Sequence, residues 1–159
     1  MPTGKGWLNS GGFDISEKTV IIAITSLKEL MFLQPIFEVV TNKSFGEAVD
    51  AVIERTKANG FRVLHVHDVQ ATLAEKNFEQ EPLKIIEVCN AKYAHTALQI
   101  EVTVSLLMPC RINVYVSEGK TVISTVKPRS LAGIFNKPEL QSFAEDVEEV
   151  LLRIIDESK

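Results

Sequence analysis

The two cysteines of the chain, Cys89 and Cys110, are the side chains with the widest range of chemistry open to them. One closes and the other opens an apolar stretch with the composition of a β-strand. If these two strands pair antiparallel, opposed Cα atoms lie about 4.5 to 5.5 Å apart, which is within disulfide range. The pair could form a disulfide or a reversible redox couple, contribute to a metal or ligand site, or remain two buried thiols.

The histidines give a weaker signal for metal binding. His65 and His67 are two residues apart in a predicted strand, so both side chains emerge on one face, as a two-histidine metal clip requires. Two ligands fall short of a closed site, and exposed or packed histidines are the simpler interpretation. His95 would complete a site with the two cysteines only if it pointed back at the sheet. We therefore predict no metal site.

A polar segment that includes Asp68, Gln70 and Thr72 could line a cleft at the end of a strand. The alternative is local, with Asp68 capping a short helix and the two other side chains satisfying turn groups. The chain contains no glycine-rich phosphate loop, GxSxG elbow, HExxH or CxxC motif. Common catalytic routes are therefore unsupported, and the sequence identifies no cofactor.

The elements that must position these residues follow from hydrophobic periodicity and turn signals. Strands are predicted at residues 34–41, 61–69, 83–89, 110–116 and 121–126. A helix is predicted between the capping box of Ser44 and Glu47 and the terminator Gly60, and others at 68–76, after Asn90 and at 136–158. This order predicts an α+β two-layer sandwich, a β-α-β4-α antiparallel sheet with helices on one face.

The N-terminal third has a different character. We predict an extension over residues 1–34, followed by a single α+β domain over 35–159. Residues 20–33 are strongly apolar and suit either a strand or a helix, so they should be buried against the domain or a second subunit. Charged residues and Pro35 interrupt the longest apolar stretch, which therefore cannot span a bilayer.

Composition narrows the class of protein. A chain of 159 residues with 45% hydrophobic and 24% charged residues suits one soluble domain. Its net charge of -4 and its lack of a basic cluster argue against nucleic-acid and anionic-membrane partners. The N-terminus lacks a secretory layout. We therefore expect a cytoplasmic protein, whose thiols normally stay reduced.

Several motifs in order resemble the domain-of-unknown-function family 302. They are GFxVLxxxDVQATLxEK at residues 60–76, the pair Cys89 and Asn90, LLxPC at 106–110, and GKTVxS at 119–124. The resemblance covers roughly residues 36–157. It implies a fold similar to that of the TATA-binding protein, a homodimer as the partner arrangement, and no established activity. The fold resemblance does not imply DNA binding.

The resemblance also marks positions for a candidate site. The characteristic residues, predicted as ligand-binding, are Asp68, Gln70, Thr72, Cys89, Asn90, Pro109 and Cys110. The chain departs from the family pattern nearby: Glu87 stands where glycine is usual, Ala91 where proline is usual, and Arg111 where asparagine is usual.

Three functions follow from these residues. The first is a non-enzymatic, homodimeric domain that binds a small molecule in a pocket whose mouth is formed by Cys89, Asn90 and Cys110. The second is a thiol redox or metal-binding protein that acts through Cys89 and Cys110. The third is a structural interaction module assembled through its N-terminal segment.

Overall fold

The computed structural model of the protein describes residues 34–159. The predictions for the N-terminal extension, including the apolar residues 20–33, lie outside this range. None of the helices within it is long and apolar enough to cross a membrane.

Five strands form one antiparallel sheet in the order β1-β5-β4-β3-β2. They are β1 (Ile36–Thr41), β2 (Arg62–Asp68), β3 (Leu83–Cys89), β4 (Cys110–Ser117) and β5 (Lys120–Val126). The tight connection from β4 to β5 is explained by Glu118 and Gly119, which both adopt positive φ angles, of 51° and 73°. A two-residue hairpin turn of this kind matches the right-handed twist of the strands that it joins.

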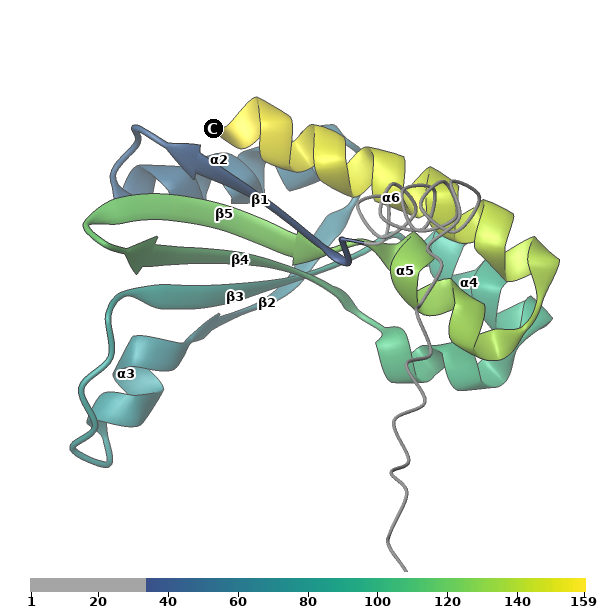
Figure 1. The fold of residues 1–159 in the computed structure, drawn as a ribbon, viewed down its shortest axis with the longest axis horizontal. Coiled ribbons are helices and arrows are strands. Elements are labelled where there is room, and N and C mark those ends of the chain that lie inside the picture. Colours follow the sequence, from purple (N-terminus) through teal and green to yellow (C-terminus); the bar gives the residue numbers. More distant parts are fainter. Residues whose placement is uncertain (1–33) are drawn as a thin grey trace, which may run out of the picture. The chain divides into compact units, whose positions relative to one another are not determined.

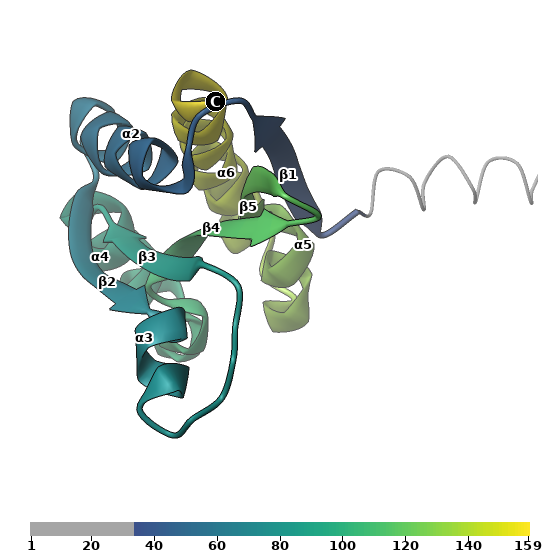
Figure 2. The ribbon, with the colours of Figure 1, turned by 90° about the vertical axis from the view of Figure 1, so that its left-hand side faces the viewer.

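Two long helices, α2 (Phe45–Ala58) and α6 (Pro138–Ser158), cover one face of the sheet (Figures 1 and 2). The predicted capping box starts α2: the backbone nitrogen of Ser44 donates to Glu47, and Ser44 Oγ accepts from the backbone nitrogen of Glu47. Gly60, with a φ of 75°, follows the helix end. The sequence therefore placed both helices correctly, and the predicted α+β arrangement is confirmed.

The remaining helices are short and lie near the ends of the sheet. They are α3 (Val69–Ala74), α4 (Ala91–Ile100), the 3-10 helix η1 (Val102–Leu107), α5 (Pro128–Ala132) and the 3-10 helix η2 (Gly133–Phe135). Figure 1 shows α3 at one end of the strands, and α4 and α5 at the other. Three of these elements, η1, α5 and η2, were not predicted from the sequence.

The core lies between the sheet and the two long helices. Alternate residues of the central strands point into it, among them Ile86, Ile112 and Ile123, which are fully buried. Leu151 and Ile155 of α6 meet them from the other layer. Branched aliphatic side chains are favoured in this setting because they pack well on a pleated surface.

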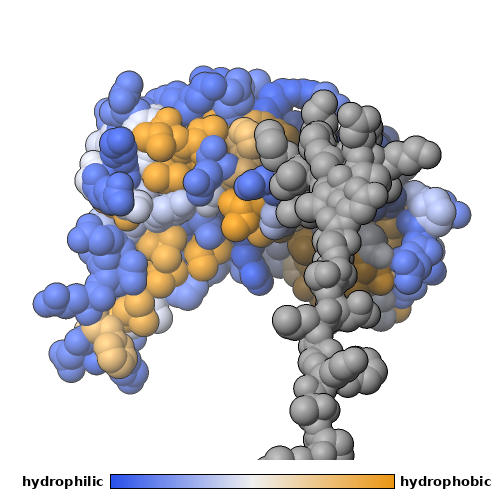
Figure 3. All heavy atoms as spheres, viewed as in Figure 1, coloured by the Kyte–Doolittle hydropathy of each residue, from blue (hydrophilic) through white to orange (hydrophobic). Residues whose placement is uncertain are grey.

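The sheet face turned away from α2 and α6 is called here the open face. Strand alternation assigns to it the residues that do not enter the core, and three of its apolar side chains are well exposed: Ile36 (54%), Val40 (58%) and Val126 (44%). Figure 3 shows apolar surface over the strands, interrupted by hydrophilic residues. The open face is therefore a mixed surface rather than a continuous apolar one.

Candidate functional site: an apolar cavity beside the cysteines

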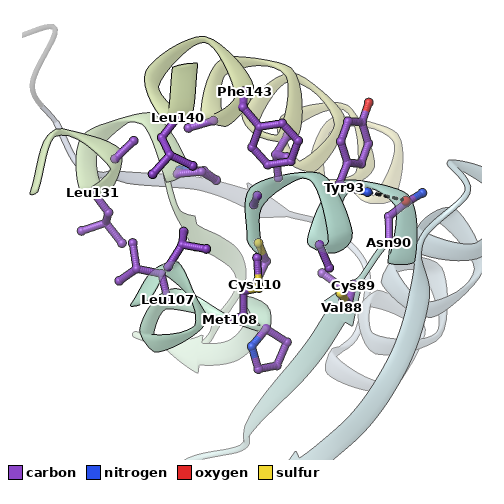
Figure 4. Close-up of a pocket in the computed structure, with 18 of the residues that line it drawn as sticks. Val88, Cys89, Asn90, Tyr93, Leu107, Met108, Cys110, Leu131, Leu140 and Phe143 are labelled. Carbon is purple, nitrogen blue, oxygen red and sulfur yellow. Dashed lines mark hydrogen bonds between the residues drawn. The ribbon is translucent and has the colours of Figure 1, made fainter. Parts of the chain in front are cut away.

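A cavity of about 250 Å³ lies where β3 ends and β4 begins. Its walls come from the two strand ends and from α4, η1, α5, η2 and α6 (Figure 4). Apolar residues form most of the lining, including Val88, Ala97, Val104, Leu107, Met108, Leu131, Phe135, Leu140, Phe143 and Val147. The polar or charged side chains of the lining are Cys89, Asn90, Tyr93, Cys110 and Arg111.

Asn90 holds together the strand and helix at the edge of this cavity. Its Oδ1 accepts hydrogen bonds from the backbone nitrogens of Lys92 (2.9 Å) and Tyr93 (3.2 Å), which caps α4. Its Nδ2 donates to the carbonyl oxygen of Gly60 at 2.8 Å. Most of its hydrogen-bonding capacity is therefore used inside the protein, and its side chain acts as a positioning group.

Three aromatic rings form one wall. The ring of Tyr93 lies 5.9 Å from that of Phe61 and 5.5 Å from that of Phe143, centroid to centroid. The second pair meets edge to face, at an interplanar angle of 69°, which is a favourable arrangement for aromatic quadrupoles. Figure 4 shows the Tyr93 and Phe143 rings side by side above the two sulfur atoms.

A salt bridge closes the wall formed by α4 and η1. Lys137 Nζ lies 3.0 Å from Glu101 Oε2 and also donates to the carbonyl oxygen of Ile100 at 2.9 Å. The other oxygen of Glu101 accepts from the side chain (2.7 Å) and backbone (3.2 Å) of Thr103. Hydrogen bonds from Thr103 and then from Lys137 lower the pKa of Glu101 to about 2. This cluster ties η1 to the residue that precedes α6.

A second ionic contact fixes α5 against α6. The backbone nitrogen of Arg129 donates to Glu148 Oε2 at 3.1 Å, and its guanidinium lies 3.5 Å from Glu148 Oε1. The Glu148 side chain is almost fully buried, with 8% of its surface exposed. The helices that complete the cavity are thus held by specific polar contacts.

The cysteines are free thiols that are not directly opposed in the sheet. The register places Val88 opposite Cys110, and Cys89 opposite Arg62 of β2. The strands thus pair antiparallel with the two cysteines as diagonal neighbours at one end of the sheet, but the cysteines are offset by one residue instead of directly opposed. Burial raises the pKa of Cys89, while burial and then the charge of Cys89 raise the pKa of Cys110 to about 11.

These pKa shifts bear directly on the predicted thiol chemistry. A nucleophilic or metal-binding cysteine needs its thiolate, which is populated when a positive group lowers the pKa. Cys89 and Cys110 are shifted in the opposite direction. At neutral pH they contribute two protonated, weakly polar sulfur atoms to the cavity wall.

Three of the seven predicted site residues lie elsewhere. Asp68 Oδ1 accepts from the backbone nitrogen of Ala71 at 2.9 Å and caps α3. Thr72 Oγ1 donates to the carbonyl oxygen of Asp68, and Gln70 Nε2 donates to that of Gln80. The local alternative considered from the sequence is therefore the one that the structure shows.

The distance along the sheet explains this separation. Asp68 ends β2, whereas Arg62, the residue opposite Cys89, begins it. Six steps of about 3.3 Å place the two positions roughly 20 Å apart. The structure brings together Cys89, Asn90, Pro109 and Cys110 around the cavity, and it does not bring Asp68, Gln70 and Thr72 to them.

The histidines also lie away from the cavity. The rings of His65 and His67 are 6.3 Å apart, and His67 Nε2 contacts Thr72 Oγ1 at 3.0 Å. Within residues 34–159, no three His, Cys, Asp or Glu side chains gather closely enough to hold a metal ion.

Two departures from the family pattern are neighbours in the sheet. Glu87 of β3 and Arg111 of β4 occupy opposed positions in the register, and His65 of β2 lies opposite Glu87 on the other side. Cross-strand pairs of opposite charge stabilise a sheet. Among the residues of 34–159 that line the cavity, Arg111 is also the only charged one.

The cavity lining contains residues that the sequence analysis did not select as site residues. Leu131 and Phe135 come from α5 and η2, and Leu140 and Phe143 come from the first turns of α6. One available signal was Pro128, since proline is favoured in the first turn of a helix and stands at the start of α5. The helical spacing of the apolar residues in α6 predicted that they are buried, but it did not predict that some of them line a cavity.

Comparisons with known proteins agree with this fold. The family model "Domain of unknown function DUF302" matches residues 37–158. The crystal structure of an uncharacterized conserved DUF302 protein from Bacillus stearothermophilus is similar, with a TM-score of 0.77 and 31% sequence identity over 79% of this chain and 99% of that one. No curated protein matches the chain. The chain belongs to the DUF302 family.

Proposed function

We propose that this protein is a non-enzymatic binding domain that holds a small, largely apolar molecule in the cavity between the sheet end and α4, α5 and α6. The observation that carries the proposal is the cavity itself, at about 250 Å³ and lined mainly by aliphatic and aromatic side chains. An engineered apolar cavity of about 150 Å³ suffices to bind benzene. The cavity in this protein therefore suits a molecule of roughly ten non-hydrogen atoms.

The chemistry of the lining supports binding rather than catalysis. Both thiols are held in the protonated form by burial, and Asn90 is engaged with the backbone of α4 and Gly60. Affinity would come from apolar area removed from water, at about 25 cal/mol per Å². A reducing compartment such as the cytoplasm suits the two free cysteines.

The test is the binding of 1-octanol, measured by isothermal titration calorimetry. We expect saturable binding by the wild type and none by Ala97→Leu, which places an isobutyl group where a buried methyl lines the cavity. The control is Val52→Ala, which removes buried methyl groups outside the cavity lining. That variant should lose about 1 to 3 kcal/mol of stability and still bind. Wild-type protein that does not bind 1-octanol would refute the proposal.

We propose, in addition, that a second copy of the chain covers the open face. Support comes from the exposed Ile36, Val40 and Val126, and from the opposite charges of Glu87 and Arg111 on the same face. A surface with both signs can complement itself across a two-fold axis.

Molar mass from light scattering tests the dimer. The full chain should elute as a dimer, and Val40→Glu should reduce it to a monomer because it buries a charge in the interface. Ile134→Glu is the matched control, since Ile134 is even more exposed, at 67% against 58% for Val40, but belongs to η2. A monomeric wild type, or a dimer unaffected by Val40→Glu, would exclude this assembly.

A further inference from the structure

A second hollow adjoins the apolar cavity at the same end of the sheet. It is a surface cleft lined by Lys57, Gly60, Phe61, Arg62, Val63, Cys89, Asn90, Ala91 and Lys92. Phe61, Cys89 and Asn90 line both the cavity and the cleft. In Figure 4, Cys89 and Asn90 lie together at one margin of the cavity. The boundary between the two hollows is therefore formed by these shared side chains.

The cleft is positively charged. Lys57 comes from the last turn of α2, Arg62 from the start of β2 and Lys92 from the first turn of α4. Within the described part of the chain, no acidic residue lines it. None of the three cations forms a salt bridge with another residue of 34–159. Three cations from separate elements thus meet in a protein whose net charge is -4.

We infer that the ligand is amphipathic, with an apolar body in the cavity and an anionic head group, such as a carboxylate or a phosphate, among Lys57, Arg62 and Lys92. The inference rests on the proposed function, because it assigns the class of ligand to the same cavity. It follows from the juxtaposition of an apolar hollow with a cationic one across Phe61, Cys89 and Asn90.

The hydrogen bond from Asn90 to Gly60 fixes the geometry of this boundary. It holds the start of α4, which carries Lys92, against the turn between α2 and β2, which separates Lys57 from Arg62. The three elements that carry the cations are therefore held together at this boundary. An anionic head group in the cleft would lie among three exposed cations that line it, each of which contributes modestly to affinity.

Charge selectivity is the measurable consequence. Octanoate, 1-octanol and octylammonium share an apolar chain and differ in the charge of the head group. We expect calorimetry at low ionic strength to give octanoate an affinity about tenfold above that of 1-octanol, since exposed charges each contribute modestly. Octylammonium should bind more weakly than 1-octanol. The preference for octanoate should shrink at 0.5 M salt, because exposed charges are then screened.

Two matched triple variants test whether the preference for octanoate depends on the three cations of the cleft. The triple variant Lys57→Gln, Arg62→Gln, Lys92→Gln should bind octanoate no better than 1-octanol, while its affinity for 1-octanol stays that of the wild type. The control removes the same number of cations outside both hollows, with Lys76→Gln, Lys120→Gln and Arg153→Gln. This control should retain the preference. Octyl phosphate in a parallel titration shows which anionic group the cleft prefers.

The outcomes separate this inference from the proposed function. Equal binding of octanoate and 1-octanol by the wild type, or an unchanged preference in the cleft variant, would overturn the inference and leave the apolar cavity as the binding site. Failure of every octyl compound to bind would overturn both.

Discussion

Asn90 Nδ2 donates a hydrogen bond of 2.8 Å to the carbonyl oxygen of Gly60, thirty residues earlier in the chain. Through it, the side chain that caps α4 also anchors the turn between α2 and β2. Asn90 lines both the cavity and the cationic cleft. Its hydrogen bonds therefore position the start of α4 for both hollows at once.

We predict that Asn90→Ala and Asn90→Ser separate the two roles of this side chain. Serine can still cap the helix but is too short to reach Gly60. Alanine can neither cap the helix nor reach Gly60. Loss of the cap costs about 1 kcal/mol, and loss of the second hydrogen bond about 1 kcal/mol more. Urea unfolding should therefore give a free energy of unfolding that falls in the order Asn, Ser, Ala. Equal stabilities of the two variants would show that the cap contributes nothing.

Cys110 should make the protein less stable in alkaline solution. Its pKa is raised from 9.0 to about 11 in the folded protein, so the folded state keeps a proton that the unfolded state releases. This contribution is complete below pH 9 and is lost as the pH rises through about 11. A shift of about two pKa units is worth on the order of 3 kcal/mol, at 1.36 kcal/mol per unit.

Unfolding of the wild type and of Cys110→Ala between pH 8 and 11 measures this effect. The free energy of unfolding of the wild type, relative to that of Cys110→Ala, should fall as the pH rises. Parallel curves would mean that the pKa of Cys110 is ordinary. Slow reaction of both thiols with a disulfide reagent at pH 7 is expected for the same reason.

Glu101 should stabilise the η1 wall of the cavity at neutral pH, and this stabilisation should be lost in acid. Its pKa is lowered from 4.5 to about 2 in the folded protein, so its contribution is present above pH 4.5 and is lost as the pH falls towards 2. The protection of η1 amides from hydrogen exchange, relative to the intrinsic exchange rate at each pH, should fall over this interval in the wild type. In Glu101→Gln, this protection should already be low at pH 6 and should change less with acid. Glu149→Gln, which removes an exposed helical salt bridge, should leave η1 exchange unchanged.

Local sequence signals predicted the elements well but not the register between them. Residues 83–89 were expected as a strand and form β3 with those bounds, because an apolar, β-branched run followed by a capping asparagine is a strong local pattern. The offset between Cys89 and Cys110 was missed. Since α4 and η1 separate β3 from β4, no hairpin turn sets their register, and tertiary packing decides it.

The sequence identified only part of the candidate site, because it carries little information on distances between segments. A family resemblance marks positions along the chain and carries no distances, so Asp68, Gln70 and Thr72 were grouped with residues roughly 20 Å away. The far wall of the cavity includes Leu131 and Phe143, which lie more than forty residues after Cys89 in the sequence. Periodicity identifies such residues as buried, but only the packed helices show that a space remains among them.

We propose that the cavity beside Cys89 and Cys110 holds an apolar guest. Crystals of the full chain soaked with bromobenzene test it most directly, because bromine is located by its anomalous signal. We expect one strong bromine peak among Ala97, Leu107, Cys110, Leu140 and Phe143, and its absence in Ala97→Leu. A cavity without bromine in the wild type, or bromine only on the open face of the sheet, would contradict it.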